Sequence, residues 1–272
     1  MTATPPDGLR ELLAFAEELA DAARGIARSH FRSHLGFDAK SDRTPVTLAD
    51  RAIERTWREA IASRYPSHSI LGEEESSAAD FDVAARAEWT WVLDPIDGTK
   101  SFATGNPMFG CLIGLRHRGR NVLGVLDAPA LGERYRAAVG LGAWHDEEPI
   151  AVRPPRSLSD AVAYCTTAAA MFEDAGWQEL QQRIGFTQYG ADCLAYAFLA
   201  SGHVDLIVDR DLRPWDWCAL AALVTAAGGA ITDWAGAPLD LHARGDVVAA
   251  SSAQLADAAR GVLCKRRGFG HA

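Results

Sequence analysis

The chain has 272 residues, of which 48% are hydrophobic and 23% are charged, and this is the composition of a globular protein rather than of a disordered one. Its net charge of −9 gives no electrostatic reason to expect nucleic acid or an anionic membrane surface as a partner. The sequence has no run near the roughly 18 apolar residues of a membrane helix, and a chain of this length normally forms one or two domains.

The first half of the sequence combines amphipathic helices with strands. Apolar residues recur at helical spacing from Leu9 to about Phe31, and a second helix is expected from Thr47 to about Arg64, with Thr47 as its cap. Strand patterns follow at residues 69–71, 89–93, 109–116, 121–127 and 134–139. The last three resemble a β-meander with glycine-bearing turns.

The second half, after Pro154 and Pro155, alternates strands and helices. We expect strands at 161–165, 204–208, 230–233 and 247–250, and helices at 191–201, 215–227 and 253–263. The pattern predicts an α/β protein with α+β layering. We expect one domain, residues 1–272, with two layered halves at about 8–152 and 153–265.

The five cysteines are odd in number, widely spaced and form no C-x-x-C pair, so buried free thiols are expected rather than disulfides or zinc ligands. The first residues, MTATPPDGLRELL, have neither the basic nor the apolar region of a secretion signal. These features predict a cytoplasmic protein.

The most informative segment is WVLDPIDGTK, residues 91–100. A buried-strand pattern leads into Asp94 and Asp97, and the proline between them is expected to turn the chain so that both acids point at one spot. Converging carboxylates repel each other unless a cation lies between them, and Mg²⁺ prefers carboxylates, waters and substrate phosphate as ligands. The backbone N–H groups of Gly98 and Thr99, at the start of a helical turn, could bind a phosphate oxygen.

Each acidic feature also has an ordinary structural explanation. The DPIDG run is a common polar turn sequence, and the acids at 73–75 could form a solvated loop. Asp50 and Asp216 lie where acids in the first turn of a helix are common. The joint occurrence of these acids favours a metal site.

Together these segments resemble the signature of the inositol monophosphatase superfamily. The matching elements are Val46-Thr47-Leu48-Ala49-Asp50, Gly72-Glu73-Glu74, Asp94-Pro95-Ile96-Asp97-Gly98-Thr99 and Trp215-Asp216, and the resemblance extends from about residue 10 to 260. It implies an αβαβα five-layer sandwich of the inositol monophosphatase or fructose-bisphosphatase type. It also implies Mg²⁺-dependent hydrolysis of a small-molecule phosphate monoester, sensitivity to lithium, and a homodimer.

The resemblance also implies roles for single residues. One Mg²⁺ would be held by Glu73, Asp94 and the carbonyl of Ile96, and a second by Asp94, Asp97 and Asp216, with a third, weaker ion near Glu73. Catalysis would use Glu73 to orient the attacking water, helped by Thr99, to which Asp50 would be hydrogen-bonded. Glu74 would support the metal ligands. The implied substrate-binding residues are Asp97, Gly98, Thr99, Asp192, Asp209 and Asp216.

Several segments resemble the histidinol-phosphate phosphatase branch more than the inositol branch. They include Lys100-Ser101-Phe102, directly after DGT, where inositol phosphatases more typically carry Thr-Asn-Phe. Asp192 aligns with a substrate-facing position that is usually small in inositol enzymes. An acid there suits a substrate with an ammonium and a protonatable imidazole, although Asp192 could instead only cap its helix. We therefore expect L-histidinol phosphate as the substrate.

Other possibilities stay open. The same chemistry would serve inositol monophosphate, a sugar phosphate or 3′-phosphoadenosine 5′-phosphate. A scaffold protein that binds metal without catalysis would usually lack a metal ligand or a water-orienting residue, and this sequence retains all of them.

Overall fold

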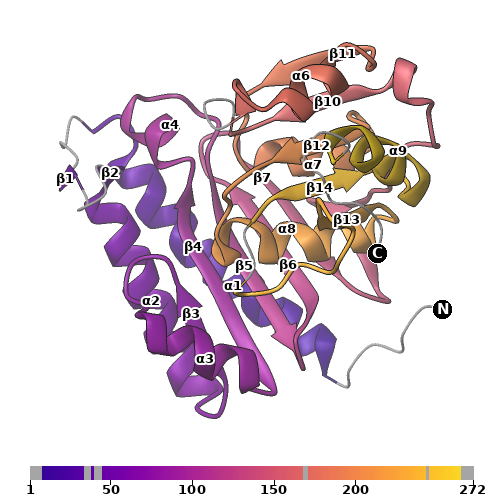
Figure 1. Ribbon diagram of the computed structural model, residues 1–272. Helices are drawn as coiled ribbons and strands as arrows, with labels where there is room; N and C mark the ends of the chain where they lie inside the picture. The colour runs from indigo at the N-terminus through magenta and orange to yellow at the C-terminus, as the bar shows by residue number, and fades with distance from the viewer. Residues whose placement is uncertain (1–7, 34–37, 40–44, 168–170, 243–244, 265–272) are drawn as a thin grey trace.

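The computed structural model describes residues 8–33, 38–39, 45–167, 171–242 and 245–264, which form five layers (Figure 1). Helices α1 (Leu9–His30) and α2 (Leu48–Arg64) cover one face of a seven-stranded sheet. Helices α7 (Leu194–Ala200) and α8 (Pro214–Ala226) lie between this sheet and a five-stranded one, whose outer face is covered by α6 (Ala175–Gln181) and α9 (Ala253–Leu263). The expected αβαβα sandwich is confirmed.

The seven-stranded sheet has its strands in chain order. They are β3 (Ser69–Gly72), β4 (Trp89–Asp97), β5 (Gly110–His117), β6 (Arg120–Ala128), β7 (Glu133–Ala138), β8 (Gly142–His145) and β9 (Glu148–Pro149). Only the β3–β4 pair in this sheet is parallel. The predicted meander is therefore confirmed, and it continues through β8 and β9.

The five-stranded sheet has the order β11 (Phe186–Tyr189), β10 (Val162–Cys165), β12 (Leu206–Asp209), β14 (Val247–Ala250) and β13 (Ala230–Asp233). Strand β10 is parallel to both of its neighbours, whereas β14 is antiparallel to both of its own. Because β10 and β12 are parallel, the chain leaves both strands at the same edge, and the residues that follow them meet there.

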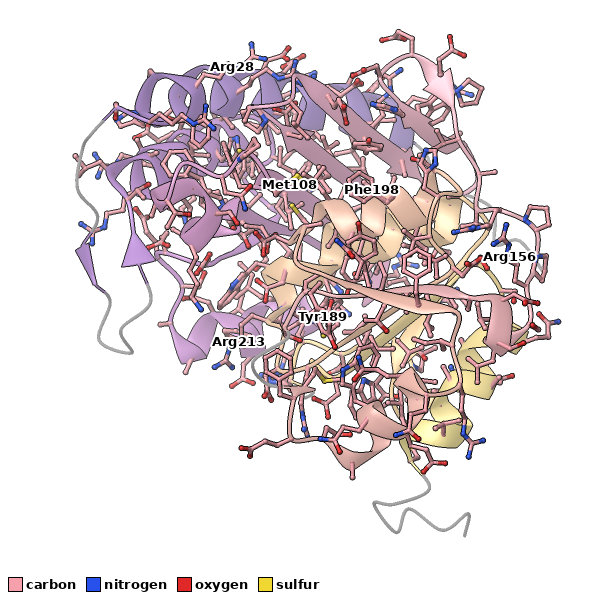
Figure 2. The ribbon with its side chains drawn as sticks, turned by 90° about the horizontal axis from the view of Figure 1, so that it is seen from above. Arg28, Met108, Arg156, Tyr189, Phe198 and Arg213 are labelled. Atoms are coloured by element: carbon pink, nitrogen blue, oxygen red, sulfur yellow. The ribbon has the colours of Figure 1, made fainter. Side chains whose placement is uncertain are left out.

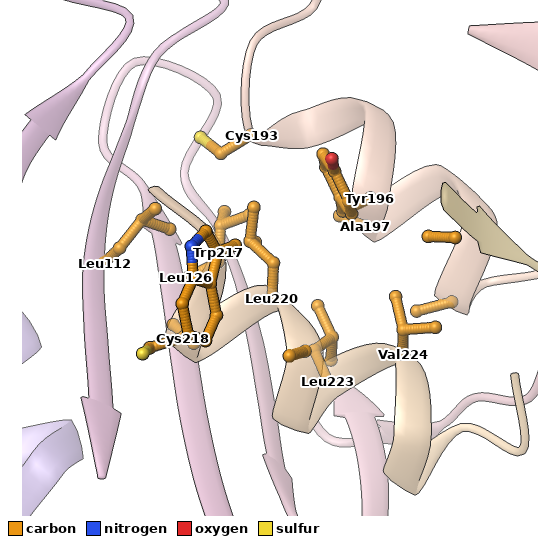
Figure 3. Close-up of a cluster of buried hydrophobic side chains, with 14 of the residues drawn as sticks. Leu112, Leu126, Cys193, Tyr196, Ala197, Trp217, Cys218, Leu220, Leu223 and Val224 are labelled. Carbon is orange, nitrogen blue, oxygen red and sulfur yellow. The ribbon is translucent and has the colours of Figure 1, made fainter. Parts of the chain in front are cut away.

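Alternation along the strands divides the apolar residues between the layers. In β4, Trp91 and Leu93 pack with α1 and α2, whereas Val92 belongs to the core around α7 and α8. Figure 3 shows this central core, in which Trp217, Leu220 and Leu223 of α8 lie between the strands and α7. Helix α8 is apolar on nearly all sides because it is covered by both sheets.

Two glycines allow α8 to pack closely on the seven-stranded sheet. A Cβ atom at Gly124 of β6 would lie 2.0 Å from the carbonyl oxygen of Ala219, and one at Gly114 of β5 would lie 2.9 Å from the Ala219 nitrogen. The backbone of α8 therefore rests directly on the backbone of β5 and β6, which sets the position of its first turn.

Two expected boundaries are wrong at the places where the chain bends. Strand β4 does not end at Leu93 but continues to Asp97, with an irregularity in its pairing with β5 between Asp94 and Asp97. The helix expected from residue 191 begins at Leu194, because Ala191 and Asp192 have positive φ angles of 70° and 43°.

The sequence patterns also missed several short elements. These are α3 (Ala78–Arg86), α6, β8, β9 and β11, the strand pair β1 (Asp38–Ala39) and β2 (Pro45–Val46), and the 3₁₀ turn η1 (Leu158–Asp160).

Seen from above, Arg28 lies on the outer helix α1 and Arg156 on the segment that links the two sheets (Figure 2).

All five cysteines are free, and all but Cys264 are buried, as expected. No helix in the described part of the chain has the length and apolar character needed to cross a bilayer. Residues 1–7, on which the expectation about a secretion signal partly rested, lie outside the described residues.

Candidate active site

A pocket of about 530 Å³ opens where the ends of the two sheets meet. It is lined by the end of β4, by α4 (Thr99–Ala103), by the segments after β10 and β12, and by the first turns of α7 and α8. Its charged lining residues are the acids Glu73, Asp94, Asp97, Asp192, Asp211 and Asp216 and the bases Lys100 and Arg210. Such an acidic pocket would repel a phosphate ester unless cations were bound in it.

Three of these acids converge. Each of Asp94, Asp97 and Asp216 offers a carboxylate oxygen, and these oxygens lie within 4.8 Å of one another. Between Asp94 and Asp97, β4 has one residue more than the facing segment of β5, which is the signature of a β-bulge. The bulge changes the alternation of side chains, so acids three residues apart can face the same side. The convergence was predicted correctly, but a bulge rather than a turn produces it.

Burial makes the negative charge of this cluster costly. Burial first, and then the charges of Glu73, Asp97 and Asp216, raise the pKa of Asp94 well above its ordinary value. Burial also raises the pKa of Asp216 to about 7. The Oδ1 atom of Asp94 is buried and has no hydrogen-bond partner among the described residues. A divalent cation would remove both penalties, and the oxygen-only donor set suits Mg²⁺, Mn²⁺ or Ca²⁺.

Glu73 reaches the pocket from a loop held by a residue that the sequence analysis missed. The fully buried carboxylate of Glu54, on α2, accepts hydrogen bonds from the backbone N–H groups of Glu74, at 2.7 Å, and Glu75, at 3.1 Å. Arg58 binds Glu54 at 2.8 Å. The available signal was an acid on the buried face of α2, between Ile53 and Trp57. The charge of Glu74 acts on Asp50, whose pKa it helps to raise after burial.

The expected hydrogen bond between Asp50 and Thr99 is absent from this structure, so this expectation was wrong. The Thr99 hydroxyl donates to the Ile96 carbonyl at 3.0 Å, while Asp50 accepts from the backbone N–H of Thr47, at 2.9 Å, and from its hydroxyl. Asp50 therefore closes a capping box at the start of α2. Its Oδ1 atom has no partner within the described ranges, and burial, with smaller effects of Glu74 and Glu73, raises the pKa of Asp50 to about 7.

Asp192 does not cap its helix, which was the alternative left open by the sequence. Helix α7 has no side-chain cap, and one carboxylate oxygen of Asp192 instead accepts a hydrogen bond from the Ser101 hydroxyl at 2.7 Å. Burial raises the pKa of Asp192, and the hydrogen bond from Ser101 opposes this shift. Its neighbour Cys193 donates its backbone N–H to Asp97 at 2.8 Å. The start of α7 is therefore hydrogen-bonded to one of the converging carboxylates.

Asp209 was expected to contact the substrate, but the structure places it behind the pocket wall. It is fully buried and is not among the described residues that line the pocket. One carboxylate oxygen accepts the backbone N–H groups of Thr166 and Thr167 and the Thr167 hydroxyl, and the other accepts the Tyr196 hydroxyl. Both oxygens therefore accept hydrogen bonds from the fold, and the fully buried Asp209 anchors the wall behind the pocket.

The other expected site residues lie together. Ile96, Gly98 and Thr99 line the pocket beside the converging carboxylates. Asp216, in the first turn of α8, also accepts the backbone N–H of Arg213 at 2.7 Å. The site therefore combines a cluster of carboxylates that could hold a cation, a nearby glycine-containing turn, and Asp192, which lies against that turn.

A layered α/β fold with an acidic cation site between two sheets defines a class of metal-dependent phosphatases. The chain belongs to the inositol monophosphatase family, whose model matches residues 8–266. Enzymes of this family use divalent metal ions and act on small phosphate esters, and the chain is accordingly a phosphomonoester hydrolase.

Relatives of two kinds resemble the chain. The "Bifunctional phosphatase IMPL2, chloroplastic" of Arabidopsis thaliana is 39% identical over 89% of this chain and 70% of that protein. A histidinol-phosphatase of Mycobacterium tuberculosis is 38% identical over 81% of this chain and 86% of its own length. The solved structure of an inositol monophosphatase from Zymomonas mobilis covers 95% of this chain and 99% of its own, with 34% identity and a TM-score of 0.83.

The raised pKa values predict how pH acts on stability without metal. Asp50 and Asp216 have an ordinary pKa of 3.8 and a folded-state value of about 7, so the folded protein binds more protons than the unfolded chain between these values. The metal-free protein should therefore lose stability as the pH rises from about 4 to about 7. Since a cation held by Asp216 would replace the proton of that residue, Mg²⁺ should raise Tm more at about pH 8 than at about pH 5. Thermal unfolding with EDTA or Mg²⁺ measures this, and an equal Mg²⁺ effect at both pH values would contradict it.

Proposed function

We propose that the protein is a Mg²⁺-dependent phosphatase that hydrolyses L-histidinol phosphate to L-histidinol and phosphate. The observation that carries this proposal is the carboxylate of Asp192, which lines the same pocket as Asp94, Asp97 and Asp216 and does not cap its helix. One end of the pocket suits cations that bind a phosphate, and its wall suits a cationic group of the same molecule. Relatives named histidinol-phosphatase support this choice.

The metal ligands are those that the family resemblance implies, and the convergence of Asp94, Asp97 and Asp216 supports three of them. Glu73, Asp94 and the Ile96 carbonyl would hold one Mg²⁺, and Asp94, Asp97 and Asp216 a second, with a third, weaker ion near Glu73. When bound, the ions would neutralise the phosphate charge, lower the pKa of the attacking water and stabilise the leaving oxygen.

The chain's own groups would position the reactants. The Glu73 carboxylate would accept a hydrogen bond from the attacking water and so orient it. The Thr99 hydroxyl already donates to the Ile96 carbonyl, so its lone pairs stay available to accept a hydrogen bond from that water. The N–H groups of Gly98 and Thr99 would bind phosphate oxygens. The catalytic role expected for Asp50 becomes an indirect one, since its contacts fix the start of α2.

Outside the proposed metal ligands the charges of the pocket lining are balanced, with Asp192 and Asp211 against Lys100 and Arg210. Net charge therefore does not separate monophosphates from sugar bisphosphates or 3′-phosphoadenosine 5′-phosphate, and the choice of a cationic substrate depends on Asp192. Inositol monophosphate, which has a neutral ring, is the main alternative, because inositol monophosphatases are also among the relatives.

A panel of phosphate esters assayed with Mg²⁺ tests the substrate. We expect kcat/KM for L-histidinol phosphate to exceed that for inositol monophosphate by about tenfold or more, because a hydrogen bond to a charged group contributes roughly 1.5–3 kcal/mol. Higher efficiency with inositol monophosphate would contradict the proposal. Complementation of a histidine auxotroph lacking this phosphatase tests the physiological role, and light scattering tests the proposed homodimer.

A further inference from the structure

Asp192 is held on the pocket wall by α4 rather than by its own helix. The Ser101 hydroxyl donates to Oδ2 of Asp192 at 2.7 Å, and Asn106 donates from Nδ2 to the same hydroxyl oxygen at 3.4 Å. Within the residues that the structure describes, Ser101 is the only hydrogen-bond donor to the Asp192 side chain. One carboxylate oxygen is thus held by Ser101, and the charge of Lys100 opposes the rise in the pKa of this carboxylate that burial causes. The other oxygen accepts no hydrogen bond from the described residues.

The backbone around Asp192 has an energetically unfavourable conformation. Gly190, Ala191 and Asp192 have consecutive positive φ angles of 86°, 70° and 43°, and the left-handed conformation is unfavourable for the two residues that are not glycine. Such strain persists only where the surrounding contacts impose it. On the facing side, a Cβ atom at Gly98 would lie 2.6 Å from Oδ2 of Asp192. The glycine therefore leaves room for the carboxylate beside the pocket.

The other acids near the pocket are less suited to bind a cationic group of the substrate. Asp209 uses both of its oxygens behind the wall. Asp94, Asp97 and Asp216 converge on one another as a metal site. Asp211 is exposed, so water screens its charge. This leaves Asp192 as a partly buried carboxylate that caps no helix and lies beside the metal cluster, where its charge, after burial, is the main cause that raises the pKa of Asp97.

Ser101 also links this acid to the phosphate end of the pocket. It lies in the first turn of α4, two residues after Thr99, while the N–H of Cys193, next to Asp192, binds Asp97. The two ends of the pocket are therefore joined by short, hydrogen-bonded connections. A small molecule with a cationic group a few bonds from its phosphate ester fits this arrangement.

We propose that Ser101 is a positioning residue that sets selectivity for cationic phosphate monoesters. Its hydroxyl holds one oxygen of Asp192, so that the other oxygen binds the ammonium or imidazolium group of the substrate. This inference rests on the proposed function, because it requires Asp192 to contact the substrate.

The test compares kcat/KM for L-histidinol phosphate with kcat/KM for glycerol 2-phosphate, whose alcohol carries no charge, in the full-length protein with Mg²⁺. Ser101→Ala should lower the ratio of the two values about tenfold, mainly through a higher KM for L-histidinol phosphate, because the unheld carboxylate loses its orientation. Asp192→Asn should lower the ratio by between about tenfold and a hundredfold. The double variant should have the ratio of Asp192→Asn alone, since Ser101 acts through Asp192.

Thr104→Ala is the matched control, because it removes a hydroxyl from the end of the same helix that bonds only to the backbone of Lys100 and Ser101. It should leave the ratio at the wild-type value. A Ser101→Ala variant that keeps the wild-type ratio, or effects of the two variants that multiply in the double variant, would overturn the inference while the proposed function stands. If the wild-type protein hydrolyses neither ester, both proposals are wrong.

Discussion

Asp94→Asn is expected to lose activity by about a thousandfold, roughly 4 kcal/mol of transition-state stabilisation, while the protein becomes more stable without metal. An amide is a poor replacement for a carboxylate that would help to hold both cations. The same change removes a buried charge that burial and the neighbours Glu73, Asp97 and Asp216 oppose. Activity with saturating Mg²⁺, and Tm in EDTA, measure the two effects.

Asp205→Asn is the matched control, since Asp205 is equally buried but does not line the pocket. One of its oxygens lies 2.9 Å from Nε of Arg153, and the other accepts the backbone N–H of Val162 at 2.8 Å. Loss of this buried ion pair should lower stability by roughly 3 kcal/mol. The two substitutions should therefore change Tm in opposite directions. Wild-type turnover in Asp94→Asn at ordinary Mg²⁺ would reject the assignment of the site.

Gly124→Ala should destabilise the protein by about 3 kcal/mol and reduce activity with it. The added Cβ would lie 2.0 Å from the Ala219 carbonyl, a backbone atom of α8 that cannot rotate away. The helix must then move off β6, and it carries Asp216 in its first turn. A displacement of α8 should thus move Asp216 away from the other carboxylates and lower the activity.

Urea denaturation with a Gly261→Ala control measures this effect. Gly261 lies in α9, where an added Cβ meets nothing within 4 Å, so alanine should stabilise the helix by up to about 1 kcal/mol. A Gly124→Ala variant within about 0.5 kcal/mol of the wild type would show that α8 can shift without cost.

The features that could be predicted from the sequence are those with a local pattern. The amphipathic stripe of α1, the apolar run of α8 and the alternation in the meander strands each follow from burial of one or both faces. The convergence of Asp94 and Asp97 could be predicted because a proline separates them just after a buried-strand pattern, whereas Asp216 was placed with them by the resemblance to the inositol monophosphatase superfamily. Short elements with few buried residues, such as α3, in which only Ala84 is buried, had no such pattern.

What could not be predicted depends on contacts between distant residues or on single backbone angles. Asp209 accepts hydrogen bonds from Thr166 and Thr167, more than forty residues earlier in the chain, and no local pattern reveals this. The start of α7 is delayed by positive φ angles at residues that are not glycine. Glu54 was overlooked because its partners are backbone N–H groups of another loop.

Anomalous scattering from a crystal grown with Mn²⁺ measures directly whether these carboxylates share divalent ions. We predict one peak between Asp94, Asp97 and Asp216 and a second beside Glu73, Asp94 and the Ile96 carbonyl. A map with no peak in the pocket at saturating Mn²⁺, and with these side chains turned away from one another, would contradict the metal-dependent mechanism.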